Sequence, residues 1–148
     1  MTNSTDERTS AARWSHFPHG ADIGVRGVGM TRAEAFEQVA LALIAAITEP
    51  SDIHPASRVS IACHAPNDAV LLVDWLNALI YEAVTRKMLF NRFRVQIEGG
   101  ELRGEAWGEP IDPARHHPAV EPKGATFTEL RVGPSPVNGW TAQCVVDV

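Results

Sequence analysis

The chain has 148 residues, of which 45% are hydrophobic and 21% charged, and this length predicts one globular domain that folds without a disulfide or a structural metal. The 13 Lys and Arg residues are outnumbered by 18 Asp and Glu residues, giving a net charge of −5. This balance argues against a stand-alone binder of RNA or DNA, because such binding depends on neutralising phosphates. No apolar run approaches the roughly 20 residues that cross a bilayer, and the N-terminal residues lack the apolar core of a signal peptide. We therefore expect a cytoplasmic protein with no membrane partner.

Residues 1–13 are polar and aperiodic, which predicts a disordered lead-in before a single domain over residues 14–148. The domain opens on a segment that contains Gly20, Gly24, Gly27 and Gly29. A phosphate-binding loop of this kind would follow a dinucleotide-binding strand, and none precedes these glycines. They fit better an early strand around Ile23–Val28 that another part of the backbone approaches closely.

Two amphipathic helices are predicted from apolar residues spaced three and four positions apart. The first begins at Thr31, which has the spacing of a capping box with Glu34: the Thr31 side chain accepts from the Glu34 amide, and the Glu34 side chain reaches back to the Thr31 amide. It ends before Pro50, because the residue before a proline disfavours helical torsions. The second helix begins near Asn67 and ends at basic residues near Lys87, which suit the negative end of the helix dipole.

The remaining predicted elements are strands. They cover Arg58–Cys63 between the helices, a hairpin of Phe93–Ile97 and Leu102–Trp107 around Gly99 and Gly100, and a last hairpin of Ala125–Val132 and Trp140–Val146. The proline-rich residues 108–122 are predicted to form a loop. This order predicts an α+β fold, a two-layer sandwich of a largely antiparallel sheet with two main helices.

The cysteines and histidines offer weak candidate chemistry. Cys63 and Cys144 lie in apolar strand-like runs, which favours buried, inert thiols over a disulfide framework. Histidines that are close in sequence form two pairs, His16 with His19 and His116 with His117. Neither pair has zinc-ligand spacing with cysteine support, so solvated loop histidines are favoured over a zinc site.

Carboxylates form the stronger candidate site. Asp22 lies in the glycine-rich segment, and Asp147 ends the last apolar strand beside Val148, which contributes a free carboxylate if the native chain ends there. Such hard oxygen ligands suit Ca²⁺, Mg²⁺ or Mn²⁺ rather than zinc. From the residues alone, the alternative is that these acids are simply solvated at chain ends.

Two basic residues and a helix face are further candidates. Arg26 among the glycines and Lys123 between Pro122 and Gly124 could meet a phosphate or a partner's carboxylate, or could be ordinary surface charges. Asp74 and Asn77 are three residues apart and so share one helix face, where they could be hydrogen-bonding scaffold or part of a site.

Several stretches in this order resemble the archease family. They are His19–Gly27, Glu34–Phe36, Leu71–Asn77, Met88–Phe90, Gly108–Asp112 with His116, Glu121–Thr126, and finally Trp140, Gln143 and Val145–Val148. The match covers almost the whole chain after the lead-in, and its joint order and spacing are more specific than any one stretch. Gly20 and Phe127-Thr128 depart from the family pattern, which usually has Thr and Tyr-His there.

The resemblance implies an accessory protein rather than a stand-alone enzyme. Archeases have a two-layer α/β fold and activate the RtcB-type RNA-splicing ligase, promoting its guanylylation and multiple turnover in tRNA splicing and RNA repair. The resemblance also implies that the partner is the ligase and that contact with RNA is only indirect. It further implies a bound divalent metal ion, with Ca²⁺ as the expected ion. The implied metal ligands are Asp22, Asp147 and Val148, and the implied functional or partner-facing residues are Lys123, His19, Arg26 and His116.

Two other functions remain open at this point. One is a chaperone-like modulator of a tRNA methyltransferase, an activity also associated with archeases. The other is a metal-dependent hydrolase, in which Asp22 and Asp147 hold a metal-bound water and His116 or His19 acts as base.

Overall fold

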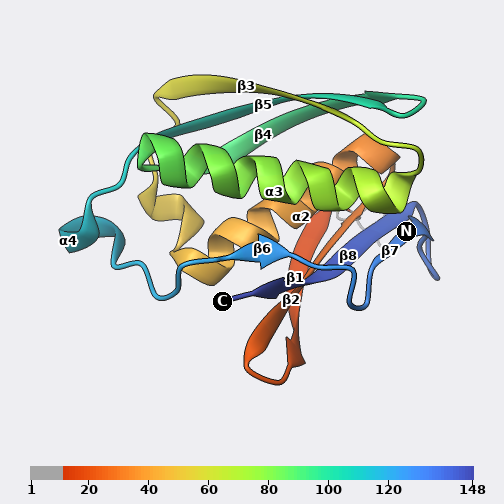
Figure 1. Cartoon of the computed structure of the whole chain (residues 1–148), viewed down its shortest axis with the longest axis horizontal. Helices are drawn as coiled ribbons and strands as arrows, with labels where there is room; N and C mark the ends of the chain where they lie inside the picture. The colour runs from red at the N-terminus through yellow and green to blue at the C-terminus, as the bar shows by residue number, and fades with distance from the viewer. Residues whose placement is uncertain (1–11) are drawn as a thin grey trace, which may run out of the picture.

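The computed structural model describes residues 12–148 (Figure 1). The predicted disorder of the lead-in falls almost entirely on residues outside this range. Within the range, the first strand is β1 (Arg13–His19), which begins on the last residue of the predicted lead-in. It forms a hairpin with β2 (Asp22–Gly29), and Gly20 makes the turn with a positive φ of 59°.

The strands of the described residues form two antiparallel sheets. The larger sheet has the order β1-β2-β8-β6, with the short β7 also paired to β8, and these last strands are β6 (Gly124–Ala125), β7 (Arg131–Pro134) and β8 (Trp140–Asp147). The smaller sheet has the order β3-β5-β4, made from β3 (Ser57–His64), β4 (Met88–Glu98) and β5 (Glu101–Pro110). The predicted α+β class and antiparallel pairing are confirmed, and the strands are divided between two sheets.

The two long helices, α2 (Arg32–Ile47) and α3 (Asp68–Arg86), lie between these sheets (Figure 1). Phe36 and Trp75 are fully buried between them, and the Trp75 Nε1 donates to the Phe36 carbonyl at 3.0 Å. Burying side chains of this size supplies about 1.5–3 kcal/mol each relative to exposure. Each sheet therefore has one face in the core and one outer face.

The helix ends follow the predicted caps with one difference. Thr31 accepts from the Glu34 amide at 3.1 Å, as predicted, but the Glu34 carboxylate accepts from the Met30 amide at 2.7 Å instead of the Thr31 amide. Asn67 caps α3 by accepting from the Val70 amide at 2.9 Å. No helix among the described residues is long and apolar enough to cross a membrane.

Four segments differ from the prediction. The strand β1 was not predicted, because most of its side chains are exposed and give no apolar alternation. The predicted loop over residues 108–122 contains a short helix, α4 (Pro113–His116), capped by Asp112, and a short 3-10 helix, η1 (Pro50–Asp52), follows α2. The predicted strand over Ala125–Val132 is instead two short strands, β6 and β7, separated by residues 126–130.

Candidate functional site

One row of residues crosses the end of the larger sheet. His19 pairs with Asp22 between β1 and β2, the β2–β8 register pairs Ile23 with Val146, and Gly124 of β6 pairs with Asp147. Because antiparallel pairing continues by one step on each strand, Asp22 faces Asp147. The order across the four strands is therefore His19, Asp22, Asp147 and Gly124, and it lies beside the C-terminus (Figure 1).

The carboxylates of this row are close enough to share a cation. Directly opposed residues on one face of an antiparallel pair have Cβ atoms about 4.5–5.5 Å apart, and like charges placed there destabilise the sheet. Asp22 Oδ1 accepts from the Val148 amide at 3.3 Å, so a chain that ends at Val148 brings a main-chain carboxylate to the same place. Two or three carboxylates with an exposed approach are a fitting donor set for Ca²⁺, Mg²⁺ or Mn²⁺.

No group of three or more His, Cys, Asp or Glu side chains among residues 12–148 is arranged to hold a metal ion. The carboxylate row itself contains two such side chains, Asp22 and Asp147, with the main chain of Val148 beside them. The histidine pairs do not form a zinc site: His16 Nε2 donates to the Ala42 carbonyl at 2.7 Å, and the neighbouring His116 and His117 differ, one buried and the other exposed.

Lys123 lies directly beside the carboxylate row. Its amide donates to the Asp147 carbonyl at 2.8 Å, while its side chain is exposed and makes no ion pair with any described carboxylate. Asn77 of α3 supports this segment, since its Oδ1 accepts from the Ala125 amide at 2.8 Å. Of the two alternatives for the Asp74–Asn77 face, the structure gives Asn77 the scaffold role.

Arg26 lies on the same outer face of the larger sheet, four residues along β2 from Asp22. Its Nε donates to Gln143 Oε1 at 2.9 Å, and its guanidinium lies over the Phe17 ring at 4.8 Å. It has no carboxylate partner among the described residues, so its charge is available to an anion.

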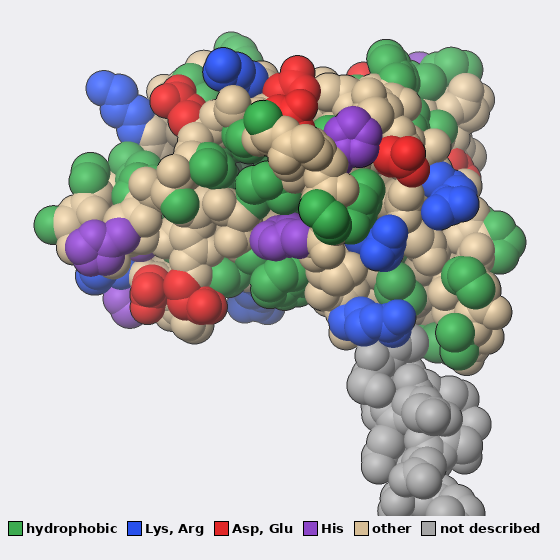
Figure 2. Space-filling model, turned by 90° about the horizontal axis from the view of Figure 1, so that it is seen from below, with side chains coloured by type: hydrophobic (Ala, Val, Ile, Leu, Met, Phe, Trp, Pro, Cys, Tyr) green, Lys and Arg blue, Asp and Glu red, His purple; other side chains and the backbone are tan. Residues whose placement is uncertain are grey.

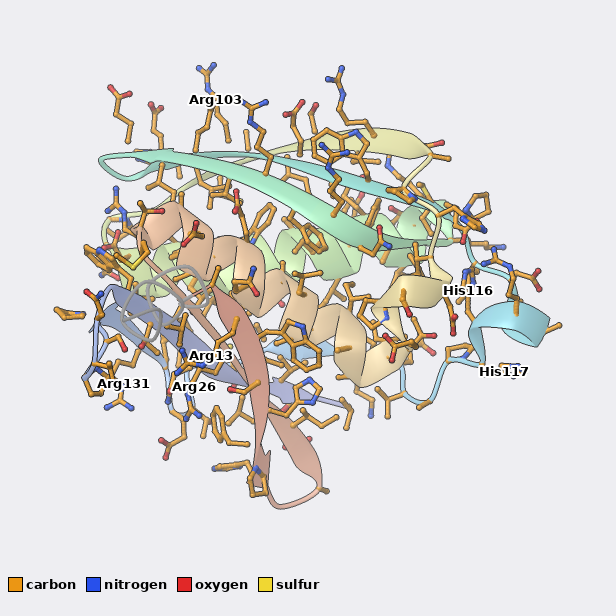
Figure 3. All side chains as sticks on the ribbon, turned by 180° about the vertical axis from the view of Figure 1, so that it is seen from behind. Arg13, Arg26, Arg103, His116, His117 and Arg131 are labelled. Atoms are coloured by element: carbon orange, nitrogen blue, oxygen red, sulfur yellow. The ribbon has the colours of Figure 1, made fainter. Side chains whose placement is uncertain are left out.

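Two further arginines gather near Arg26. Arg131 pairs with Gln143 from β7, and Arg13 lies on β1 (Figure 3). Figure 2, which views the molecule from this side, shows several basic side chains at one end of the face. Sequence analysis missed Arg13 and Arg131, because only the strand register brings them together.

His116 is not part of this row. Its Nδ1 accepts from the Asp112 amide at 2.8 Å, so the proton lies on Nε2, which donates to Glu109 Oε2 at 2.9 Å. Its carbonyl accepts from the Thr48 hydroxyl, and its side chain is fully buried. His116 thus ties α4 to β5 and α2 at one end of the molecule, well separated from Arg26 (Figure 3). With both ring nitrogens engaged, it is placed as a structural residue.

Acid stability is expected to depend on Glu109. Hydrogen bonds from the His54 amide, Arg115 and His116 lower the pKa of Glu109 from 4.5 to about 2. A carboxylate whose pKa is lower in the folded than in the unfolded protein stabilises the fold above the unfolded value, and this contribution is lost as the pH falls from about 4.5 to about 2. Glu109→Gln should therefore lower the free energy of unfolding at neutral pH and lower it progressively less in acid. Urea unfolding of both proteins from about pH 7 to pH 3 measures this, and an equal difference at all pH values would contradict it.

Both cysteines have a raised thiol pKa in this fold. Both are free, Cys144 is buried, and Cys63 is half-buried. Burial raises the pKa of each thiol to about 11, so the reactive thiolate is scarce at neutral pH. This agrees with the predicted inert thiols.

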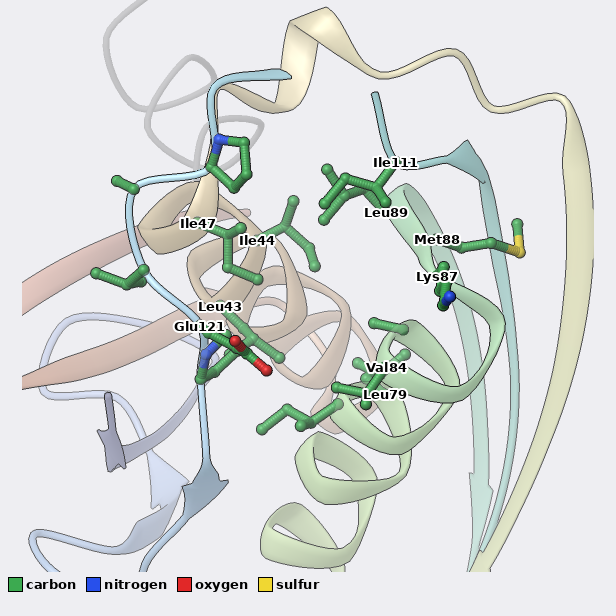
Figure 4. Close-up of a pocket in the computed structure, with 16 residues that line it drawn as sticks. Leu43, Ile44, Ile47, Leu79, Val84, Lys87, Met88, Leu89, Ile111 and Glu121 are labelled. Atoms are coloured by element: carbon green, nitrogen blue, oxygen red, sulfur yellow. The ribbon is translucent and has the colours of Figure 1, made fainter. Parts of the chain in front are cut away.

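A largely apolar cavity of 440 Å³ lies between α2, α3, the start of β4 and residues 118–122, the segment that precedes Lys123 (Figure 4). Its charged lining residues are Lys87 and Glu121, which project from different walls. The remaining lining residues are apolar, among them Leu43, Ile44 and Leu79. The cavity has no set of converging polar groups that would orient a reacting molecule.

These features define a small α+β protein whose candidate site is an exposed row of carboxylates, flanked by a lysine, at the end of an antiparallel sheet. Over residues 14–148 the chain matches the Archease protein family. Proteins named archease from Pyrococcus furiosus and Methanosarcina barkeri are 37% and 33% identical to it, over 92% of this chain and 99% and 96% of theirs. The chain belongs to the archease family.

Solved structures share this fold. The solution structure of a Methanobacterium thermoautotrophicum protein is 28% identical, with a TM-score of 0.79 over 91% of this chain and 98% of that one. The crystal structure of a Thermotoga maritima archease has the same fold, with a TM-score of 0.58 at 17% identity over 89% of this chain and 94% of that one.

Proposed function

We propose that this chain is an accessory protein that activates an RtcB-type RNA-splicing ligase, promoting its guanylylation and its repeated turnover. Membership of the archease family supports this proposal. The observation that carries it is the exposed row of Asp22 and Asp147 with Lys123 beside it. A site that lies open on a sheet face, with an unpaired lysine, is suited to contact with a partner protein.

In this proposal Asp22, Asp147 and a terminal carboxylate at Val148 hold a divalent cation, with Ca²⁺ as the expected ion and Mg²⁺ or Mn²⁺ as alternatives. The cation neutralises the opposed carboxylates and supplies open coordination positions for oxygen ligands of the partner. Lys123, whose amide is fixed on Asp147, reaches a phosphate or carboxylate at the ligase's nucleotide site. His19 at the end of the row and Arg26 on the same face contact the partner around it.

The structure bears differently on the two alternative functions, a hydrolase and a modulator of a tRNA methyltransferase. In a hydrolase, His116 is poorly placed as a base because its ring is buried and both nitrogens are engaged, which leaves His19 in the row. A chaperone-like modulator of a tRNA methyltransferase would use the same exposed face, and the Thermotoga maritima relative is described as a "possible chaperone". We favour the ligase because the carboxylate row and Lys123 suit a partner that itself uses a metal and a nucleotide.

A ligation time course with the ligase limiting, in GTP and Mn²⁺, tests the proposal. The ligase alone is expected to give a burst of one round, and adding this protein is expected to sustain turnover. If the rate is unchanged while the ligase is active, the activator role is wrong. Hydrolysis of RNA or nucleotide by the protein alone, or co-purification with a methyltransferase, would then identify which alternative holds.

The role of Lys123 has a matched control within the chain. Lys87 is the only other lysine and is also exposed, but it lies at the C-terminal end of α3. Lys123→Gln is expected to reduce the sustained ligation rate by at least about tenfold, as expected when one charge-assisted contact is lost. Lys87→Gln is expected to leave the rate unchanged, and an equal loss in both variants would remove Lys123 from the site.

A further inference from the structure

The outer face of the smaller sheet carries a second cluster of charged side chains. The register of β3, β5 and β4 aligns its outward residues in four rows: Arg58, Trp107 and Arg92; Ser60, Glu105 and Arg94; Ala62, Arg103 and Gln96; and, at the hairpin end, His64, Glu101 and Glu98. No described element covers this face, and Figure 3 shows Arg103 projecting away from the helices. The face is therefore free to meet another molecule.

The first three rows concentrate positive charge in a chain whose net charge is −5. They hold four of the 13 basic residues and one carboxylate, Glu105, whereas the row at the hairpin end holds Glu101 and Glu98. Only Arg58 pairs with Glu105, at 3.1 Å, and Arg94 and Arg103 have no ion-pair partner among the described residues. Unpaired guanidinium groups so placed attract an anionic partner.

The shape of the face suits an extended ligand. A hollow of 510 Å³ is lined by residues of all three strands, among them Ala62 of β3, Arg103 and Glu105 of the central β5, and Arg94 of β4. Successive rows are two residues apart along each strand, or about 6.7 Å, so guanidinium groups repeat along the sheet. At one end the Arg92 guanidinium lies over the Trp107 ring at 4.8 Å.

We propose that this face binds the backbone of a single-stranded nucleic acid, with Arg94 and Arg103 on successive phosphates and a base stacked on the Arg92–Trp107 pair. Bases stack on aromatic rings and on guanidinium planes, so the stacked pair adds a contact that an acidic peptide would not use. This inference does not depend on the proposed ligase activation, because it concerns the other sheet.

Fluorescence anisotropy with labelled single-stranded RNA and DNA oligonucleotides tests the proposal on the full chain. Given the acidic net charge, we expect weak binding at low salt, with a Kd of about 10⁻⁶ to 10⁻⁴ M. Arg94→Ala/Arg103→Ala is expected to weaken binding at least about tenfold. It should also reduce the slope of log K against log salt by about 1.4, or about 0.7 for each lost phosphate contact.

The control removes two basic residues from the C-terminal end of α3. Arg86→Gln/Lys87→Gln changes the net charge equally, and both residues are exposed, so it is expected to bind like the wild-type protein. Equal weakening by the two double variants, or no anisotropy change with either nucleic acid, would overturn the proposal. Competition by polyglutamate as strong as by RNA would also overturn it and identify the face as a site for an acidic protein.

Discussion

Asp22→Asn and Asp147→Asn variants are each expected to lose most of the thermal stabilisation that Ca²⁺ gives the wild-type protein. The two carboxylates face each other across β2 and β8, and a cation between them replaces repulsion with attraction. A ligand present at 100 times its Kd adds about 2.7 kcal/mol to the stability of the folded state. For a domain of this size that raises the Tm by about 5–10 °C. Thermal melts in Ca²⁺ and in EDTA measure this difference without any ligase.

Without metal, neither the Asp22→Asn nor the Asp147→Asn variant should be less stable than the wild-type protein. Asparagine keeps the oxygen that accepts from the Val148 amide but removes the charge, so in EDTA each variant is expected to melt at or slightly above the wild-type Tm. Glu98→Gln, which removes an exposed carboxylate from the smaller sheet, is the control and should keep the full Ca²⁺ effect. If the Asp22→Asn protein is stabilised by Ca²⁺ as strongly as the wild type, the cation does not bind at this row.

Local sequence signals predict the helices of this fold well and its sheets less well. The caps at Thr31 and Asn67 act within a few residues of the helices they begin, so their chemistry is visible in the sequence. The division of the strands between two sheets depends on pairings between distant residues, such as Arg26 with Gln143, which no local pattern encodes. The edge strand β1 escaped prediction because its mostly exposed side chains give no apolar alternation.

For the candidate site, too, local chemistry could be predicted from the sequence, whereas contacts between distant residues could not. Oxygen chemistry and the archease resemblance singled out Asp22 and Asp147, and the strand register places them opposite each other. Their metal and partner roles remain predictions. The ring of His116 is used instead in a buried contact with Glu109, seven residues away, which depends on how α4 folds back on β5. The arginine rows of the smaller sheet were likewise invisible before the register was known.

Gly27→Ala is expected to be among the most destabilising single substitutions in the chain. A Cβ at this position would lie 2.2 Å from the Val39 amide nitrogen and 2.3 Å from the Ala35 carbonyl oxygen, both on the backbone of α2. Backbone cannot move aside as a side chain can, so α2 and β2 must separate and loosen the core between them. Overpacking typically costs about 1–3 kcal/mol, and we expect the upper end or more here, measured by urea unfolding. The predicted close backbone approach at the glycine-rich segment is thus located at Gly27.

Two other glycines of the same sheet make this expectation specific. A Cβ on Gly133 of β7 would meet no atom within 4 Å, so Gly133→Ala is expected to be neutral or to stabilise by up to about 1 kcal/mol through the unfolded state. A Cβ on Gly24 would press on the Phe17 ring, a side chain near the surface that can rotate away, so its cost should fall between the two. If Gly27→Ala were no more destabilising than Gly133→Ala, α2 would not lie against β2 as described. The loss of unfolding free energy should therefore decrease in the order Gly27→Ala, Gly24→Ala, Gly133→Ala. This ranking tests the packing of α2 against β2, which holds the carboxylate row in register.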